Sequence, residues 1–247
     1  MAEQVDVSPE LYEKINNDFK ASVAGDKNLR KLVNKIRAGA ATQQDVAKYS
    51  TILGRYSSKA LKNTLKFDIL PNSTLYWNIA EKTIGVLLLG NYASINRMAT
   101  QQLSAADKAM NLGIQVVAGR NPAVRISQVM NFACNSVTQE ELDNALTDPV
   151  IAANRKFFDD FQRANGEIRT EMGLEQIVVR TYDGVGLHDG KEPCQWCIER
   201  EGTWDYQDAI SNGVFERHPG CGCDIEVISK RGVNRQINWR NNEWEES

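Results

Sequence analysis

Histidine and cysteine are scarce in this chain of 247 residues, which has two histidines and five cysteines. Four of the cysteines and one of the histidines nevertheless fall into two short stretches, CQWC at 194–197 and HPGCGC at 218–223. The shortage of histidine excludes a nuclease of the ββα-metal kind, which needs its own histidines in addition to those that bind a structural metal. Only His188 and His218 are available, and His218 lies within the second stretch.

Long hydrophobic runs are also absent. The longest apolar run is residues 84–89, which contains Gly85 and is far too short to cross a bilayer. The first residues, MAEQVDVSPELYEK, lack the basic and apolar regions of a secretory signal. We therefore expect a soluble protein without membrane contacts, made in a reducing cytoplasm, where clustered cysteines favour metal binding over disulfides.

A large net charge is missing as well, since the formal value is −3. The whole-molecule balance therefore gives no indication of a nucleic-acid or membrane partner. The distribution is uneven, because residues 1–66 contain 12 Lys or Arg and 7 Asp or Glu. Such a surplus usually marks a solvated helical face, and a contact with a polyanion such as DNA through these basic N-terminal helices is the alternative.

Most of the sequence has helical periodicity. Ser8 is expected to cap a helix with Pro9 at its first position, followed by Leu11, Ile15, Phe19 and Val23 on one face. A second helix follows Gly25 and ends near Gly39, and a third runs from a capping pair, Thr42 and Asp45, to about residue 65. Thr138 and Glu141 form a further capping box. Phe157, Phe158 and Phe161 are expected to lie in the core of a later helix.

The pattern changes at Gly173. The stretches LEQIVVRTY and CDIEVIS predict strands, separated by glycine-rich loops and the two Cys stretches. We predict an α+β protein with a mainly α-helical region over residues 1–172, which makes protein contacts, and a small α+β module over residues 173–247. A module of about 75 residues has a small core, so a bound metal would stabilise it substantially.

The two Cys stretches predict a structural zinc site. A C-x2-C turn presents two thiolates to one ion, and a second short turn supplies the remaining ligands of a tetrahedron. Five candidates compete for four positions, and the spacing leaves open which of the last three is spare. The candidates are Cys194, Cys197, His218, Cys221 and Cys223.

Other interpretations of the cluster stay open on the sequence alone. The four cysteines could form two disulfides, or remain reduced thiols without a metal. A catalytic zinc needs an open position and a general base, for which Glu199 and Glu216 are the nearest candidates. A nucleophilic pair such as Cys197 with His218 lacks any protease signature around it. Cys134 lies in an apolar stretch and is interpreted as a core thiol.

Residues 182–190, YDGVGLHDG, follow a predicted strand and contain Gly184 and Gly186. The third glycine comes one residue late, and Pro193 stands where a helix should begin, so this segment is interpreted as a turn and not as a dinucleotide-binding loop. His188 is interpreted as a loop histidine at the surface.

The order of these features resembles the head morphogenesis family of tailed phages, the Mu F-like minor head proteins. The likeness covers roughly residues 175–228. It lies in a helical region followed by an Asp-containing loop, C-x2-C, a glycine, and H-P-x-C-x-C before a strand. The family usually has arginine between the last two cysteines, where this chain has Gly222. The matching residues are Asp189, Cys194, Cys197, Gly202, Thr203, Trp204, His218, Pro219, Cys221 and Cys223.

The resemblance implies a minor capsid protein of the virion, present in few copies in the capsid interior and assembled near the portal in the host cytoplasm. Portal and major capsid proteins are the expected partners, with roles in head morphogenesis and in DNA packaging or ejection. We expect no enzymatic activity. The alternative function is a zinc-stabilised nucleic-acid-binding protein, which the salt dependence of DNA binding would distinguish.

Overall fold

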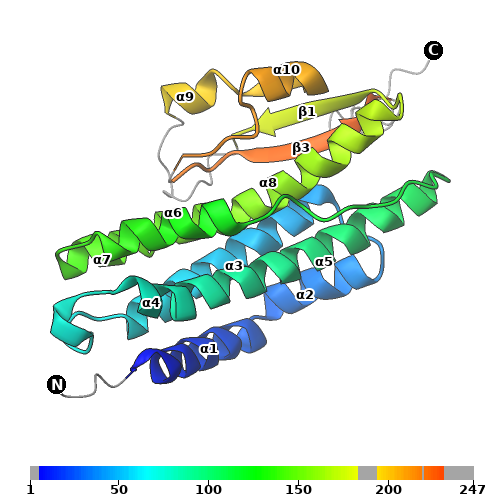
Figure 1. Cartoon of the computed structure of the whole chain (residues 1–247). Helices are drawn as coiled ribbons and strands as arrows, with labels where there is room; N and C mark the ends of the chain where they lie inside the picture. The colour runs from blue at the N-terminus through cyan, green and yellow to red at the C-terminus, as the bar shows by residue number, and fades with distance from the viewer. Residues whose placement is uncertain (1–5, 183–193, 219, 231–247) are drawn as a thin grey trace, which may run out of the picture.

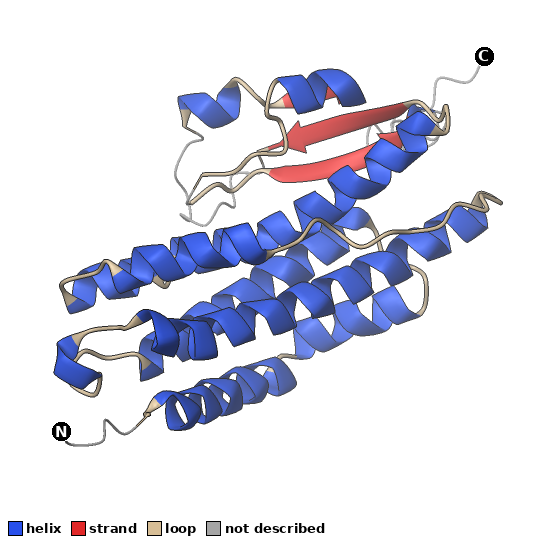
Figure 2. Ribbon diagram, viewed as in Figure 1, coloured by secondary structure: helices blue, strands red, loops and turns tan. Residues whose placement is uncertain are grey.

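The computed structural model describes residues 6–182, 194–218 and 220–230. The predicted loop at 183–190, with His188 and Asp189, lies outside the described residues, as do Pro193, Pro219 and the segment 231–247. The architecture is α+β, as predicted: a body of helices carries a small antiparallel sheet formed by the C-terminal part of the chain (Figures 1 and 2).

The helical body begins with α1 (Ser8–Gly25), α2 (Lys27–Arg37) and α3 (Gln43–Thr64). The 3-10 turn η1 (Pro71–Ser73), the short helix α4 (Trp77–Ala80) and the π-helical turn η2 (Glu81–Gly85) lead into α5 (Val86–Ala109). The body is completed by α6 (Ala123–Cys134), α7 (Gln139–Ala145) and α8 (Asp148–Glu171). No helix in the described ranges combines the length and the apolarity that a bilayer span requires.

Local capping signals explain where several helices begin. Thr42 with Asp45 and Thr138 with Glu141 form the two predicted capping boxes at the starts of α3 and α7. The predicted cap of the first helix is wrong by one residue, because Ser8 is already helical and Val7 occupies the cap position. The reason is Asp6, whose carboxylate accepts hydrogen bonds from the Ser8 amide and hydroxyl.

The main core lies between α1, α3, α5 and α8, and it includes Phe157, Phe158 and Phe161 as predicted. Helix α8 is covered on two sides. In Figure 1, α3 and α5 lie on one side of it, and the sheet with α9 (Gln195–Ile198) and α10 (Tyr206–Ser211) lies on the other. This arrangement buries most of α8, including the charged side chains Arg155, Lys156, Asp159 and Asp160.

The sheet has three antiparallel strands in the order β2-β1-β3. The two predicted strands are confirmed as β1 (Gln176–Thr181) and β3 (Asp224–Ser229), and β2 (Gly202–Asp205) is a strand that the sequence analysis missed. A second small core joins the sheet to α10 and contains Val178, Tyr206, Phe215 and Val227.

Gly166 of α8 allows this layer to approach closely, because a Cβ atom there would lie 2.5 Å from the Tyr206 ring. The Tyr206 hydroxyl donates to the Arg163 carbonyl of the same helix. Helix α8 is therefore the element on which the C-terminal layer rests.

Candidate metal centre

The first ligand-bearing segment is the start of α9. Cys194 caps this short helix, and its carbonyl accepts hydrogen bonds from the amides of Cys197 at 2.9 Å and Ile198 at 3.1 Å. The turn places the two thiols on the same side of the helix start, which is the geometry that C-x2-C offers to one ion. Cys194 is exposed and Cys197 is buried, so the pair lies at the boundary between the surface and the interior.

The second segment approaches from the loop before β3. The Cys221 amide donates to the His218 carbonyl at 3.1 Å, which closes a turn of the same length as the first. Gly220 in this turn has φ of 80°, a left-handed conformation that favours glycine. Cys221 and Cys223 are both buried, and Cys223 immediately precedes β3.

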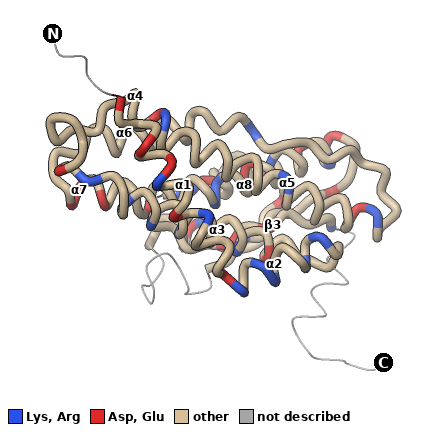
Figure 3. The backbone as a smooth tube through the Cα atoms, turned by 90° about the horizontal axis from the view of Figure 1, so that it is seen from below, with Lys and Arg blue, Asp and Glu red and all other residues tan. Residues whose placement is uncertain are grey.

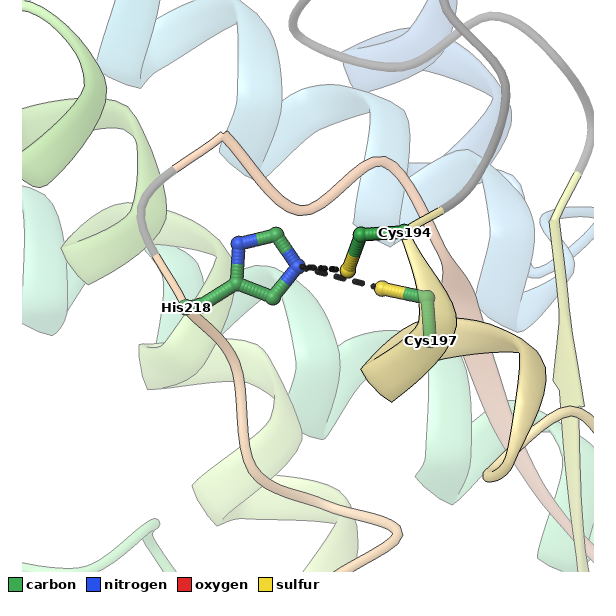
Figure 4. A group of neighbouring side chains, drawn as sticks. All are labelled: Cys194, Cys197 and His218. Carbon is green, nitrogen blue, oxygen red and sulfur yellow. Dashed lines mark hydrogen bonds between the residues drawn. The ribbon is translucent and has the colours of Figure 1, made fainter.

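The two segments bring all five predicted residues into one cluster, positioned to hold a metal ion. The His218 Nε2 atom lies 3.2 Å from the Cys194 Sγ and 3.2 Å from the Cys197 Sγ, as Figure 4 shows. The Sγ atoms of Cys197 and Cys221 are 3.8 Å apart. Two overlapping trios result, Cys194 with Cys197 and His218, and Cys197 with Cys221 and Cys223.

All five cysteines lie in the described part of the chain, and all are free thiols. The separation of 3.8 Å between the Cys197 and Cys221 sulfurs is far longer than the disulfide bond length of about 2.05 Å. The alternative of two disulfides is therefore not the arrangement in the structure. Cys134 lies on α6, away from the cluster, and burial raises the pKa of its thiol.

Three buried arginines surround the cluster, and the sequence analysis missed their role. Arg180 of β1 is fully buried and lies 3.4 Å from the Cys221 Sγ and 3.8 Å from the Cys197 Sγ through Nη2. Its Nη1 donates to the carbonyls of Val214 and Glu216, which fixes the guanidinium beside the sulfurs. Arg217 adds a second cation, with Nη1 3.7 Å from the Cys221 Sγ.

These surroundings favour a thiolate at Cys221. A hydrogen bond from the Cys223 thiol lowers the pKa of Cys221 to about 4 against the effect of burial, and the charges of Arg217 and Arg180 act in the same direction. The hydrogen bond to Cys221, together with burial, raises the pKa of Cys223. Burial, followed by the negative charge of Cys221, raises the pKa of Cys197 to about 11.

Arg155 connects the cysteine loop to α8. Its Nη1 donates to the Cys221 carbonyl at 3.2 Å, and its Nη2 donates to the Cys223 carbonyl at 2.6 Å and to the Asp224 carboxylate at 2.9 Å. The Gly222 carbonyl accepts a longer bond of 3.4 Å. Gly222 occupies the position where the resembling family usually has arginine. In this chain Arg155 of α8 supplies a guanidinium group to the loop.

A second anchor joins Arg217, the residue before His218, to α8. Its guanidinium makes a two-point ion pair with Asp159, and both side chains are almost completely buried. One helical turn away, Lys156 donates to the Phe215 carbonyl and pairs with Asp160. The loop with Cys221 and Cys223 is thus attached to the helical body by buried charges.

Trp196 forms the outer wall of the cluster. Its ring lies edge to face against His218 at 5.5 Å between centroids, and the Arg200 guanidinium stacks 4.1 Å from its centre. The two carboxylates nearest in sequence form ion pairs with arginine: Glu216 pairs with Arg125 at 3.1 Å, and Glu199 pairs with Arg200 at 3.6 Å.

A separate cleft of about 560 Å³ lies where α5, α8 and β3 meet the start of α3. Leu103, Phe158 and Phe161 give it apolar walls. Two buried acceptors line it without a hydrogen-bond partner among the described residues, Asp107 Oδ1 and Gln162 Oε1. The cleft shares no residue with the cysteine cluster.

Comparison of the chain with protein-family models, curated proteins and solved structures finds no match.

Proposed function

We propose that this chain is a phage minor head protein: a structural component of the prohead near the portal, in which a zinc ion holds the C-terminal module together. The observation that supports this proposal best is the geometry of the cysteine cluster. The order C-x2-C and H-P-x-C-x-C before a strand carries the resemblance to the Mu F-like family, and in the fold the four cysteines and His218 form two trios that share Cys197.

Zinc is the metal that fits the donors. Soft thiolates with one imidazole are typical of tetrahedral zinc, in which two sulfurs lie about 3.8 Å apart, and nitrogen and sulfur about 3.6 Å apart. The spacing of 3.8 Å between Cys197 and Cys221, and the spacings of 3.2 Å from His218 to Cys194 and Cys197, lie within about 0.4 Å of these values.

The ligands proposed are Cys194, Cys197, His218 and Cys221, which leaves Cys223 as the spare residue. These four come from two turns of equal length, each closed by a hydrogen bond from the fourth residue to the first. Cys223 lies outside both turns, directly before β3. A zinc ion with three thiolates and one histidine carries a net charge of −1, and the buried guanidiniums of Arg180 and Arg217 compensate it.

We assign the zinc a structural role. Four protein ligands close the tetrahedron and leave no position for a reactive water. Both candidate bases are engaged in ion pairs with arginine. Zinc binding then fixes the conformation of the loop that Arg155 and Arg217 attach to α8.

Portal or major capsid protein is the proposed partner, in the capsid interior. Several large apolar side chains are exposed on α4, α5 and α6, which pack around η2 at one end of the body. Exposed apolar surface of this kind is typical of protein contacts. The residues are Trp77, Val86, Leu89, Val124 and Phe132.

The proposal is tested by deleting the gene from the phage or prophage that encodes it and analysing purified proheads and virions by mass spectrometry. We expect the wild-type chain in these particles in a few copies, and fewer DNA-filled heads after deletion. Absence of the chain from both kinds of particle would overturn the proposal.

A further inference from the structure

The surface of α3 carries a row of basic side chains that the metal centre does not involve. Residues 27–66, which form α2 and α3 with their connections, contain ten Lys or Arg and a single acidic residue, Asp45. Asp45 is buried at the start of α3 and pairs with Lys35 at 2.7 Å. The excess positive charge of the N-terminal part is therefore concentrated on this helical hairpin.

Four of the ten cations are spaced along one line of α3. At 3.6 residues per turn, offsets of 7, 11 and 14 residues from Lys48 fall within about 60° of one another around the helix axis. The row extends about 21 Å, at 1.5 Å per residue. We call it the α3 basic row, and Figure 3 colours Lys and Arg positions along the backbone. It consists of Lys48, Arg55, Lys59 and Lys62.

The row faces solvent. Lys48, Arg55 and Lys59 are exposed, and Lys62 is half-buried. None of the four makes an ion pair with a described residue, whereas Lys66, which follows the end of α3, pairs with Asp143 at 3.3 Å. Other residues of α3 are buried: Val46, Leu53 and Leu61 lie in the core that α3 shares with its neighbours. The line of cations is therefore on the part of the helix that remains at the surface.

We propose that the α3 basic row binds the phosphate backbone of duplex DNA. A straight row of about 21 Å is as long as roughly 6 base pairs, at 3.4 Å per pair along one strand. Lysine and arginine on a helix contact phosphates without reading sequence. The net charge of −3 does not oppose this contact strongly, because at physiological salt charges more than about 8 Å away are largely screened. This inference goes beyond the proposed function, since it depends neither on zinc nor on the presence of the chain in virions.

The number of contacts sets the salt dependence. Four unpaired cations that each neutralise one phosphate give a slope of about −3.6 for the logarithm of the binding constant against the logarithm of salt concentration. Binding should then weaken about 150-fold between 50 and 200 mM salt. No base-specific contact is expected, so duplexes of different sequence should bind equally.

The test uses the full metal-loaded chain, a fluorescent 30-base-pair duplex and anisotropy measured from 20 to 200 mM salt. In the row variant, Lys48, Arg55, Lys59 and Lys62 are all changed to Gln, and the slope should approach zero. The control variant removes the same charge from the exposed face of the neighbouring helix and should keep the wild-type slope. It carries Gln at positions 27, 30, 31 and 37, which are Lys, Arg, Lys and Arg.

Two results would overturn the proposal: wild-type chain that shows no salt-sensitive binding, or a control variant that loses as much binding as the row variant. Circular dichroism melts establish that both variants are folded. If the row variant fails to fold, the single substitutions Lys48→Gln and Arg55→Gln are measured instead. Each should make the salt-dependence slope about 0.9 less steep. An unchanged slope in both single variants would overturn the proposal as well.

Discussion

Replacing Arg155 by methionine should separate the cysteine loop from α8. Methionine fills much of the same space but donates no hydrogen bond, so the Asp224 carboxylate and the carbonyls of Cys221 and Cys223 each lose the bond that Arg155 donates. Burial, and then the nearby charge of Arg217, lower the pKa of Arg155 to about 10, so the guanidinium is still charged at neutral pH. The substitution therefore removes one member of a buried ion pair.

The expected cost follows from that burial. Removing one partner of a buried, hydrogen-bonded ion pair typically costs about 3–5 kcal/mol. For a chain of this size each kcal/mol lowers Tm by about 2–4 °C, so Arg155→Met should lower Tm by about 6–20 °C. The measurement is a thermal melt of the metal-loaded chain, followed by circular dichroism.

Arg120→Met is the matched control. Arg120 pairs with Glu167, and both side chains are about half exposed. Exposed pairs of this kind contribute less than about 1 kcal/mol, so the control should melt close to wild type. If Arg155→Met also melted within about 2 °C of wild type, the inference that α8 anchors the cysteine loop would be wrong.

Three further predictions concern the ligand set, a capping charge and a close approach. Cys197→Ala should abolish binding of one equivalent of zinc measured by mass spectrometry, whereas Cys223→Ala should retain it; the reverse result would exchange their roles. Burial opposes the charged form of Asp45, but hydrogen bonds from Lys35 and Thr42 outweigh it and hold its pKa below 3.8. The stability that Asp45 contributes is therefore complete above about pH 4 and lost as the pH falls further, so the Tm difference between wild type and Asp45→Asn should shrink from pH 7 to pH 3; a constant difference would contradict this. Gly166→Ala should cost about 1–3 kcal/mol in chemical denaturation, since the added methyl would meet the Tyr206 ring, whereas Gly25→Ala, which meets nothing within 4 Å, should cost nothing.

The sequence was sufficient where structure depends on neighbouring residues. The capping boxes at Thr42 and Thr138 involve residues three positions apart, and both were predicted correctly. The five metal candidates were also found, because C-x2-C and H-x2-C are local turns. The cap at Ser8 was placed one residue late because the Asp6 carboxylate competes for the same role.

Features that depend on tertiary contacts were missed. β2 is four residues long and mostly exposed, so it lacks the apolar alternation by which a strand is recognised. Nothing in the sequence indicated that the charged residues of α8 beside the Phe157 stripe would be buried. They are buried because a second layer covers α8, and no periodicity within one helix reveals such a layer. Arg155 precedes the loop that it holds by more than 60 residues.

The central claim is that Cys194, Cys197, His218 and Cys221 bind one structural zinc ion. Elemental analysis of the purified chain tests it most directly. The account predicts about one equivalent of zinc per chain, with the ligand thiols unreactive toward Ellman's reagent until a chelator removes the metal. Less than about half an equivalent of zinc, with all the clustered thiols reactive in the folded chain, would contradict it.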